Sequence, residues 1–221
     1  MRVASDQQSP NAVPRRPRGR PATASRDDVL RLVRAQFLAG ERVDLTLVAA
    51  TLGLGRATIY RWFGSREALL GQVIGDELEQ LLSRRRREVR RRGPEGLLEV
   101  FDRVNRTLSR SGALRALLEQ ERQNALRLLT SSGGVVQPRA VTCVESMIAA
   151  EVNAGRYDPP ADPATVAYAI VRLCEAFLYN DAAIGIRGDY ERLREVQGAL
   201  LGVPQVATRR DARPRRAGGR S

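Results

Sequence analysis

Residues 52–70, LGLGRATIYRWFGSREALL, hold the side chains whose types and spacing best suit nucleic-acid chemistry. Arg56 and Arg61 could each bond guanine O6 and N7 in a bidentate pair, and Thr58 could meet a base edge or a thymine methyl. Tyr60 could donate its hydroxyl to a phosphate, a contact that fixes position without reading sequence. These residue types favour a surface that contacts double-stranded DNA.

The same stretch supplies the apolar positions that such a surface needs. Ile59 and Phe63 are four residues apart, so they share one face of a helix and would hold it to a core. Arg66 and the free N–H groups after Ser65 offer a phosphate contact at a helix N-terminus, and no acidic residue lies between Leu52 and Arg66. The alternative is a corner of an ordinary helical bundle with a solvated Arg/Tyr face, because such patterns have many false positives.

Three short helices would position this surface. Ser25 is a good N-cap for a first helix that ends at Gly40, and Asp44 can cap a second. Gly53 makes the turn into a third helix over residues 56–63, which gives the order of a helix-turn-helix. The second helix is expected to bury Leu47, Val48, Ala49 and Leu52.

Helical periodicity continues along the chain, with almost no strand alternation. Ser65 caps a long helix expected to run to about Arg92, where Gly93 and Pro94 end it. Further helices are expected over residues 94–110, over 113–129 as one or two pieces, up to about 154, from 163, and over 189–201. We therefore predict an all-α fold: a disordered basic arm (1–24), a three-helix helix-turn-helix domain (25–70), a larger helical domain (71–203) and a disordered basic tail (204–221).

The composition excludes several classes of chemistry. The chain has no His, and all 37 basic residues are Arg, which removes His-dependent nucleophilic sites, Schiff-base lysines and Walker-type phosphate loops. Cys143 and Cys174 are far apart and suggest buried thiols in a reducing compartment. An enzyme would have to rely on carboxylates or Tyr, and no paired constellation stands out. We expect no enzymatic activity, no metal site and no cofactor.

The chain also lacks signals for membranes. No apolar run is long enough to span a bilayer, and the first residues contain no apolar stretch of the signal-peptide type. A cytoplasmic protein without a membrane partner is therefore expected.

The net charge of +12 is concentrated in the two end segments. Residues 1–24 and 204–221 carry nine of these charges, so the charge favours a polyanionic partner without showing that the folded part reads DNA. In the first segment, PRGRP resembles an AT-hook core, in which Arg18 and Arg20 would lie along a narrow minor groove. The alternative is a disordered basic tail with only general phosphate attraction.

The run LTLVAATLGLGRATIYRWFGSREALL, residues 45–70, resembles the N-terminal DNA-binding domain of the TetR family of transcriptional regulators. The positions that match the family's signature are Tyr60, Phe63, Ser65, Arg66, Glu67 and Leu69. The resemblance implies that Thr46 and Tyr60 touch phosphates, that Arg66 clamps the backbone, and that bases face Arg56, Ala57, Thr58 and Arg61. Gly55 stands where the family often has Ser or Thr, so we expect a slightly more mobile start of the third helix.

Residues 94–203 resemble the helical effector and dimerisation domain of the same family, and YAIVRLCEAFLYND (168–181) is similar to its QsdR-type branch. Polar groups on this otherwise apolar helix could fix the polar head of a ligand while apolar side chains line the rest of a pocket. The candidate pocket residues are Phe101, Leu117, Arg172, Glu175, Phe177 and Tyr179. The alternative is an Arg172–Glu175 pair at i, i+3 within an ordinary core.

These observations predict a homodimer formed through about residues 163–201. Two recognition helices about one DNA turn (~34–36 Å) apart would require a near-palindromic operator. The resemblance implies a repressor that a small apolar effector, of lactone or acyl type, releases from DNA. The alternative is a helical module whose basic tails bind nucleic acid without sequence preference.

Overall fold

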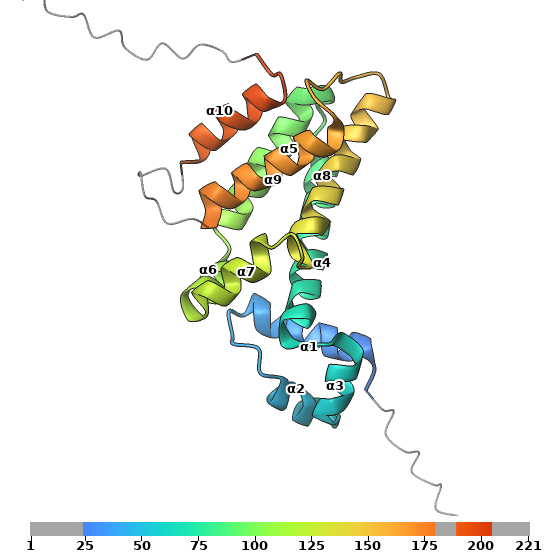
Figure 1. Cartoon of the computed structure of the whole chain (residues 1–221), viewed down its shortest axis with the longest axis vertical. Helices are drawn as coiled ribbons and strands as arrows, with labels where there is room; N and C mark the ends of the chain where they lie inside the picture. Colours follow the sequence, from blue (N-terminus) through green and yellow to red (C-terminus); the bar gives the residue numbers. More distant parts are fainter. Residues whose placement is uncertain (1–23, 180–188, 205–221) are drawn as a thin grey trace, which may run out of the picture.

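A computed structural model describes residues 24–179 and 189–204, and within them it contains ten helices and no strand. The expected all-α fold is confirmed. Figure 1 shows three short helices at one end of the molecule, from which α4 leads into a helical bundle. The first four helices are α1 (Arg26–Leu38), α2 (Leu45–Leu52), α3 (Arg56–Phe63) and α4 (Arg66–Glu88). The others are α5 (Gly93–Ser109), α6 (Gly112–Gln120), α7 (Arg122–Thr130), α8 (Val136–Asn153), α9 (Pro163–Tyr179) and α10 (Tyr190–Leu200).

Local capping chemistry sets the starts of the first helices. Ser25 and Asp28 form a capping box, in which the Ser25 hydroxyl accepts the Asp28 amide at 3.2 Å and the Ser25 amide donates to the Asp28 carboxylate at 2.7 Å. Asp44 accepts the Thr46 amide at 2.7 Å and caps α2. Gly53 has a φ of 64°, the left-handed conformation that turns the chain toward α3.

Two details differ from the sequence-based expectations. The helix α4 ends at Glu88, not near Arg92, because Val89 is buried with an extended backbone and the Gly93 amide is held by Glu151 at 2.8 Å. Leu47 is 60% exposed, not buried. The inward face of α2 is taken by Leu45, Val48 and Ala49, whose spacing of three and four residues leaves Leu47 on the opposite side.

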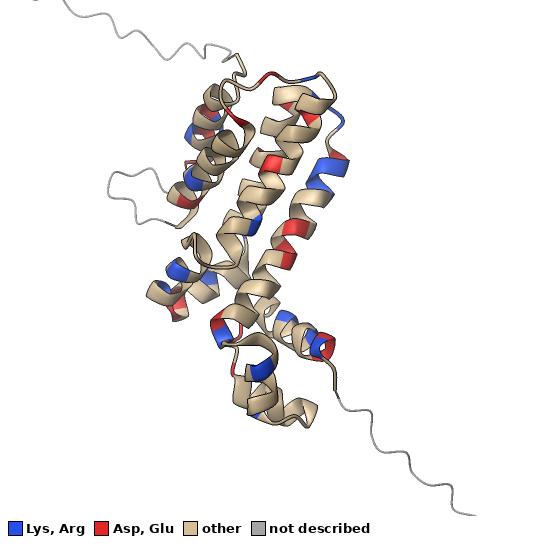
Figure 2. Ribbon diagram, turned by 45° about the vertical axis from the view of Figure 1, so that its right-hand side comes forward, with Lys and Arg blue, Asp and Glu red and all other residues tan. Residues whose placement is uncertain are grey.

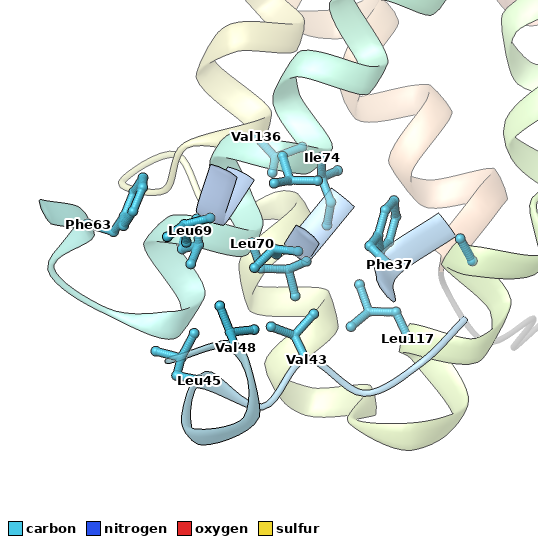
Figure 3. Close-up of a cluster of buried hydrophobic side chains, with 14 of the residues drawn as sticks. Phe37, Val43, Leu45, Val48, Phe63, Leu69, Leu70, Ile74, Leu117 and Val136 are labelled. Carbon is cyan, nitrogen blue, oxygen red and sulfur yellow. The ribbon is translucent and has the colours of Figure 1, made fainter. Parts of the chain in front are cut away.

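The buried side chains form two cores. One core joins α1, α2, α3 and the start of α4 to α6, α7 and the first residue of α8. Figure 3 shows Leu117 of α6 beside Phe37 of α1, and Val136 of α8 beside Ile74 of α4. The other core joins the second half of α4 to α5, α8 and α9. The predicted domain boundary at residue 70 stays a prediction, and the first core extends across it. Because this core is closely packed, a shift of α6 or α7 would displace residues of the helix-turn-helix.

Buried and half-buried charges tie the elements of the bundle together. Glu151 of α8 is fully buried and accepts hydrogen bonds from Arg86 of α4, from Arg156 at 2.7 Å and from the Gly93 amide. Burial alone would raise the pKa of Glu151, but these hydrogen bonds and the two guanidinium charges lower it to about 2. The carboxylate is therefore charged in the fold and fixes the junction of α4, α5 and α8.

Acidic residues lie in the middle of α4, and a run of arginines lies at its far end (Figure 2). Arg139 of α8 bonds Asp76 at 2.7 Å and Glu79 at 2.8 Å, and Arg34 of α1 pairs with Glu77. Much of the charge on α4 is thus used in contacts with neighbouring helices. None of the helices in the described ranges is long and apolar enough to cross a membrane.

Candidate DNA-contact surface and ligand cavity

The helix α3 separates its anchoring side from its exposed side. Ile59 and Phe63 are buried, at 1% and 9% exposure. We call the exposed residues Arg56, Ala57, Tyr60 and Arg61 the recognition face. Thr58 is only half-buried, so part of its side chain is still accessible. All the residues that were expected to meet bases therefore lie on one short helix, with donors and a methyl group that can reach a groove.

The two ends of α3 are held differently. Gly55 caps its N-terminus without any side-chain hydrogen bond, as expected. At the other end, Arg26 of α1 donates to the Trp62 carbonyl at 2.8 Å, and its guanidinium carbon lies 5.0 Å from the centre of the Phe63 ring. Sequence reasoning missed this contact because Arg26 and Trp62 are 36 positions apart. The C-terminal end of α3 is consequently fixed to α1, and its N-terminal end is the freer one.

The start of α2 adds exposed residues beside this helix. Thr46 is exposed, and because its amide is bonded to Asp44, its hydroxyl is the group left for a phosphate. Leu47 next to it is an exposed apolar side chain that sequence reasoning placed in the core. A leucine at this position can contact a sugar or a thymine methyl. The exposure of Leu47 could have been predicted, because Leu45, Val48 and Ala49 have the spacing of the buried face of the helix.

The resemblance implies that Arg66 contacts the DNA backbone, but its side chain faces inward. Its side chain is 19% exposed and donates to both carboxylate oxygens of Glu121, at 2.6 and 3.0 Å, and to the Val43 carbonyl at 2.7 Å. Glu121 lies at the corner between α6 and α7, 55 residues further along the chain. Because these contacts turn the guanidinium toward α6 and α7, Arg66 links two parts of the molecule and is not available to a DNA backbone in this conformation.

The expected minor-groove residues Arg18 and Arg20 lie outside the described residues, as does the basic tail from residue 205. Their role stays a prediction.

A cavity of about 60 Å³ lies between α4, α5, α7, α8, α9 and α10. Its wall is mostly apolar, with Leu78 and Leu82 from α4, Phe101 from α5 and Val144 from α8. Of the six candidate pocket residues, Phe101, Glu175 and Tyr179 line it. The cavity holds a few water-sized spheres at most, so a larger ligand would have to move its wall.

The other three candidates lie elsewhere. Leu117 packs in the first core beside Phe37 and Gly40. Arg172 does not line the cavity, and it donates to the Thr130 carbonyl and to the Tyr168 hydroxyl, both at 3.0 Å. Phe177 is two residues beyond Glu175, about 200° around the helix, and therefore belongs to another side of α9. The Arg172–Glu175 pair expected as the alternative is present, at 2.8 Å.

One side of the cavity is polar, and sequence reasoning missed most of it. Asn105 of α5 donates to the Gln197 side chain of α10 at 3.0 Å, and Gln197 donates to the Ile170 carbonyl at 3.3 Å. The Cys174 thiol donates to Asn105 at 3.1 Å, and burial raises its pKa to about 12. Asn105 and Gln197 are 92 positions apart, so no local pattern joins them. Within the described ranges, no cluster of His, Cys, Asp or Glu could hold a metal ion.

Comparison with known proteins gives concordant matches. Residues 92–202 match a family described as the tetracyclin repressor-like C-terminal domain. Among solved structures, the transcriptional repressor QsdR of the TetR family from R. erythropolis is 30% identical, over 81% of this chain and 95% of QsdR, with a TM-score of 0.73. The TetR family repressor AlkX from Dietzia sp. strain DQ12-45-1b is similar in fold, at 23% identity over 79% of this chain and 94% of AlkX, with a TM-score of 0.51. The comparison with curated proteins finds no match.

Proposed function

This chain belongs to the TetR family of transcriptional regulators, and we propose that it is a homodimeric repressor that a small apolar effector releases from a near-palindromic operator. The observation that carries the proposal is the recognition face, which stands exposed on a helix anchored by Ile59 and Phe63. The similarity to QsdR, itself a repressor, supports the sign of the regulation.

On the operator, each group of the recognition face has a role that its chemistry allows. Arg56 and Arg61 bond guanine in the major groove, and Ala57 and the accessible part of Thr58 contact a base edge or a thymine methyl. Tyr60, 41% exposed, and the hydroxyl of Thr46 contact phosphates and fix the register. Arg66 is left out of this set because Glu121 holds it.

The dimer is proposed to form through α9 and α10, within residues 163–201. Each of these helices keeps one large apolar side chain exposed after packing on its own bundle: Tyr168 at 47% and Val196 at 43%. A second copy that covers these side chains through a two-fold axis would be a self-complementary interface. Its geometry has to separate the two copies of α3 by about one DNA turn, ~34–36 Å.

Ligand control is proposed to act through α4. The helix lines the cavity through Leu78 and Leu82, and its first turn begins directly after α3. A ligand larger than the cavity must displace these side chains, and the shift changes the spacing of the recognition helices. The mostly apolar wall is compatible with the effector of lactone or acyl type that the resemblance of residues 168–181 implies. Ligand and operator then oppose each other by one coupling free energy, typically ~1–3 kcal/mol.

The test is the base preference of single-residue variants on an operator selected from random DNA. Arg61→Ala should relax the preference at one position and cost about 1–3 kcal/mol there, whereas Tyr60→Phe should weaken all sequences equally. Arg115→Ala, which removes an exposed charge on α6, is the matched control and should leave the preference unchanged. The reverse pattern would refute the orientation of α3. A wild-type chain without sequence preference would instead favour a module that coats nucleic acid through its tails.

A further inference from the structure

The cavity described above has a neighbour with which it shares a wall. We call the cavity of about 60 Å³ the first compartment and the adjoining hollow of about 160 Å³ the second compartment. The side chains that line both are Leu78, Leu108, Leu129, Val136 and Tyr179. Because the same five residues bound both spaces, they form the partition between the two compartments.

The two compartments end at different parts of the molecule. The first ends at the polar side chains of α5, α9 and α10. The second reaches Phe37 and Leu38 of α1, which is one of the three helices of the helix-turn-helix, and Leu38 is still 47% exposed. Ile74 of α4 and Leu114 of α6 make its wall apolar there, and Glu77, Arg84, Thr107 and Ser111 also line it. A molecule that occupied both spaces would touch the effector bundle at one end and the DNA-binding helices at the other.

The polar end of the first compartment offers one acceptor. Glu175 is 9% exposed, and its Oε2 accepts from Arg172 at 2.8 Å, while its Oε1 is buried and has no hydrogen-bond partner among residues 24–179 and 189–204. Asn105 and Gln197 already form a hydrogen bond with each other, so they have less hydrogen-bonding capacity left for a ligand. A buried acceptor without a partner is costly, and a ligand that donates a hydrogen bond to it recovers that cost.

We propose that the effector is a linear amphiphile whose uncharged head donates a hydrogen bond to Glu175 and whose hydrocarbon tail extends past the shared wall into the second compartment, against α1. A carboxylate head is disfavoured because it would bring a second negative charge beside Glu175. The binding mode stands on the compartments and on Glu175, and its regulatory consequence rests on the function proposed above. Short amphiphiles fill only the first compartment, and long ones also push on α1.

The head group is tested by direct binding of 1-alkanols, from 1-hexanol to 1-dodecanol, to the full chain, with the methyl ethers of the same alcohols as probes that lack the donor. The wild type should bind each alkanol about tenfold more tightly than its ether, the usual value of a hydrogen bond to a charged group. Glu175→Met should abolish that ratio. Tyr168→Phe, which removes a hydroxyl that accepts from Arg172 but keeps both Arg172 and Glu175, should preserve it. If Glu175→Met does not fold, Glu175→Gln should still reduce the ratio, because a neutral acceptor bonds less strongly.

The tail is tested by Leu38→Trp, which enlarges a side chain that lines only the second compartment. This variant should lose about tenfold in affinity for the longest alkanols and nothing for 1-hexanol, since the ring excludes about two methylene groups and each buried methylene raises affinity about fourfold. Leu47→Trp adds the same ring to an exposed leucine outside both compartments and should change neither affinity.

Three results would overturn the assignment: no alkanol binding to the wild type, equal affinities for alkanols and ethers, or an equal effect of Leu38→Trp at every chain length. Operator release is measured separately, by the anisotropy of a labelled operator. Release by long but not by short alkanols supports both the binding mode and ligand control. Alkanol binding with the stated dependence but without release would support the binding mode and refute ligand-controlled repression.

Discussion

Glu121→Gln should show how strongly the effector helices are tied to the DNA-binding helices. Glu121 lies between α6 and α7, and its carboxylate accepts two hydrogen bonds from Arg66 at the start of α4 and one from Arg42 at 3.3 Å. The Glu121 side chain is 9% exposed and that of Arg66 is 19% exposed, whereas that of Arg42 is 74% exposed. The pair with Arg66 is therefore shielded from solvent, and the contact with Arg42 is not.

The magnitude follows from these contacts. A hydrogen bond to a charged group contributes ~1.5–3 kcal/mol, and a glutamine can return one weaker, neutral bond to Arg66. Arg66 also keeps its bond to the Val43 carbonyl. The exposed contact with Arg42 adds little, as surface ion pairs do. The variant should thus lower the free energy of unfolding by about 2 kcal/mol.

The assay is urea-induced unfolding at one fixed protein concentration, because the proposed dimerisation would make the midpoint depend on concentration. Glu119→Gln is the matched control, since it changes an exposed glutamate on α6, two residues before Glu121, and should shift stability by less than about 0.5 kcal/mol. Arg66→Gln combined with Glu121→Gln should cost less than the two single changes added together, because both remove the same contact.

The pair of Arg66 with Glu121 contributes no stability if Glu121→Gln shifts the midpoint no more than Glu119→Gln, or if the effects of Arg66→Gln and Glu121→Gln are additive. The same variant also bears on regulation. When an effector is known, its influence on operator affinity should be smaller in Glu121→Gln than in the wild type, because one of the links between the bundle and the helix-turn-helix is lost.

Three further outcomes are expected. The pKa of Glu151 is lowered to about 2 in the fold, so the stabilising effect of its charge is complete above the unfolded value of about 4.5 and is lost as the pH falls through 2. Glu151→Gln should therefore lower the urea midpoint at pH 7 and flatten the decline of the midpoint in acid. Parallel curves of midpoint against pH for the two proteins would contradict this. Gly55→Ser should stabilise the start of α3 by a few tenths of a kcal/mol, because a serine can cap the helix with its hydroxyl. The site accepts the change, since Gly55 has a φ of −74° and an added Cβ would meet only the Thr58 hydroxyl at 3.9 Å. Calorimetry that shows no gain in stability over Gly55→Ala would argue against capping as the cause. Removal of residues 1–22 should weaken operator binding and reduce the salt dependence of the affinity, and an unchanged salt slope would exclude the arm from the complex.

The parts of the fold that sequence predicts are those decided by local chemistry. Ser25 and Asp44 predict the starts of their helices, because a capping side chain accepts from an amide only two or three residues further along the chain. Gly53 announces the turn because few other residues take a positive φ. The spacing of Ile59 and Phe63 likewise identifies the buried side of α3, and with it the recognition face.

The parts that sequence does not predict depend on residues far apart in the chain. Arg66 matches the family's signature, and only the fold shows that Glu121 occupies it. Leu117 has the spacing of any inward leucine, and nothing local says which of the two cores it enters. A glutamine at position 197 of an amphipathic helix is expected at the surface, yet Gln197 is fully buried. Its side chain can be buried because it forms hydrogen bonds with Asn105 and with the Ile170 carbonyl.

The central claim is that α3 reads a specific DNA sequence. It is tested most directly by the ratio of the affinities of the full chain for an operator selected from random DNA and for a scrambled duplex of the same length, at an ionic strength of about 0.15 M. If α3 reads a specific sequence, the ratio should be ~10³ or more, which is the lower bound for specific DNA-binding proteins. Equal affinities for the two duplexes would contradict it.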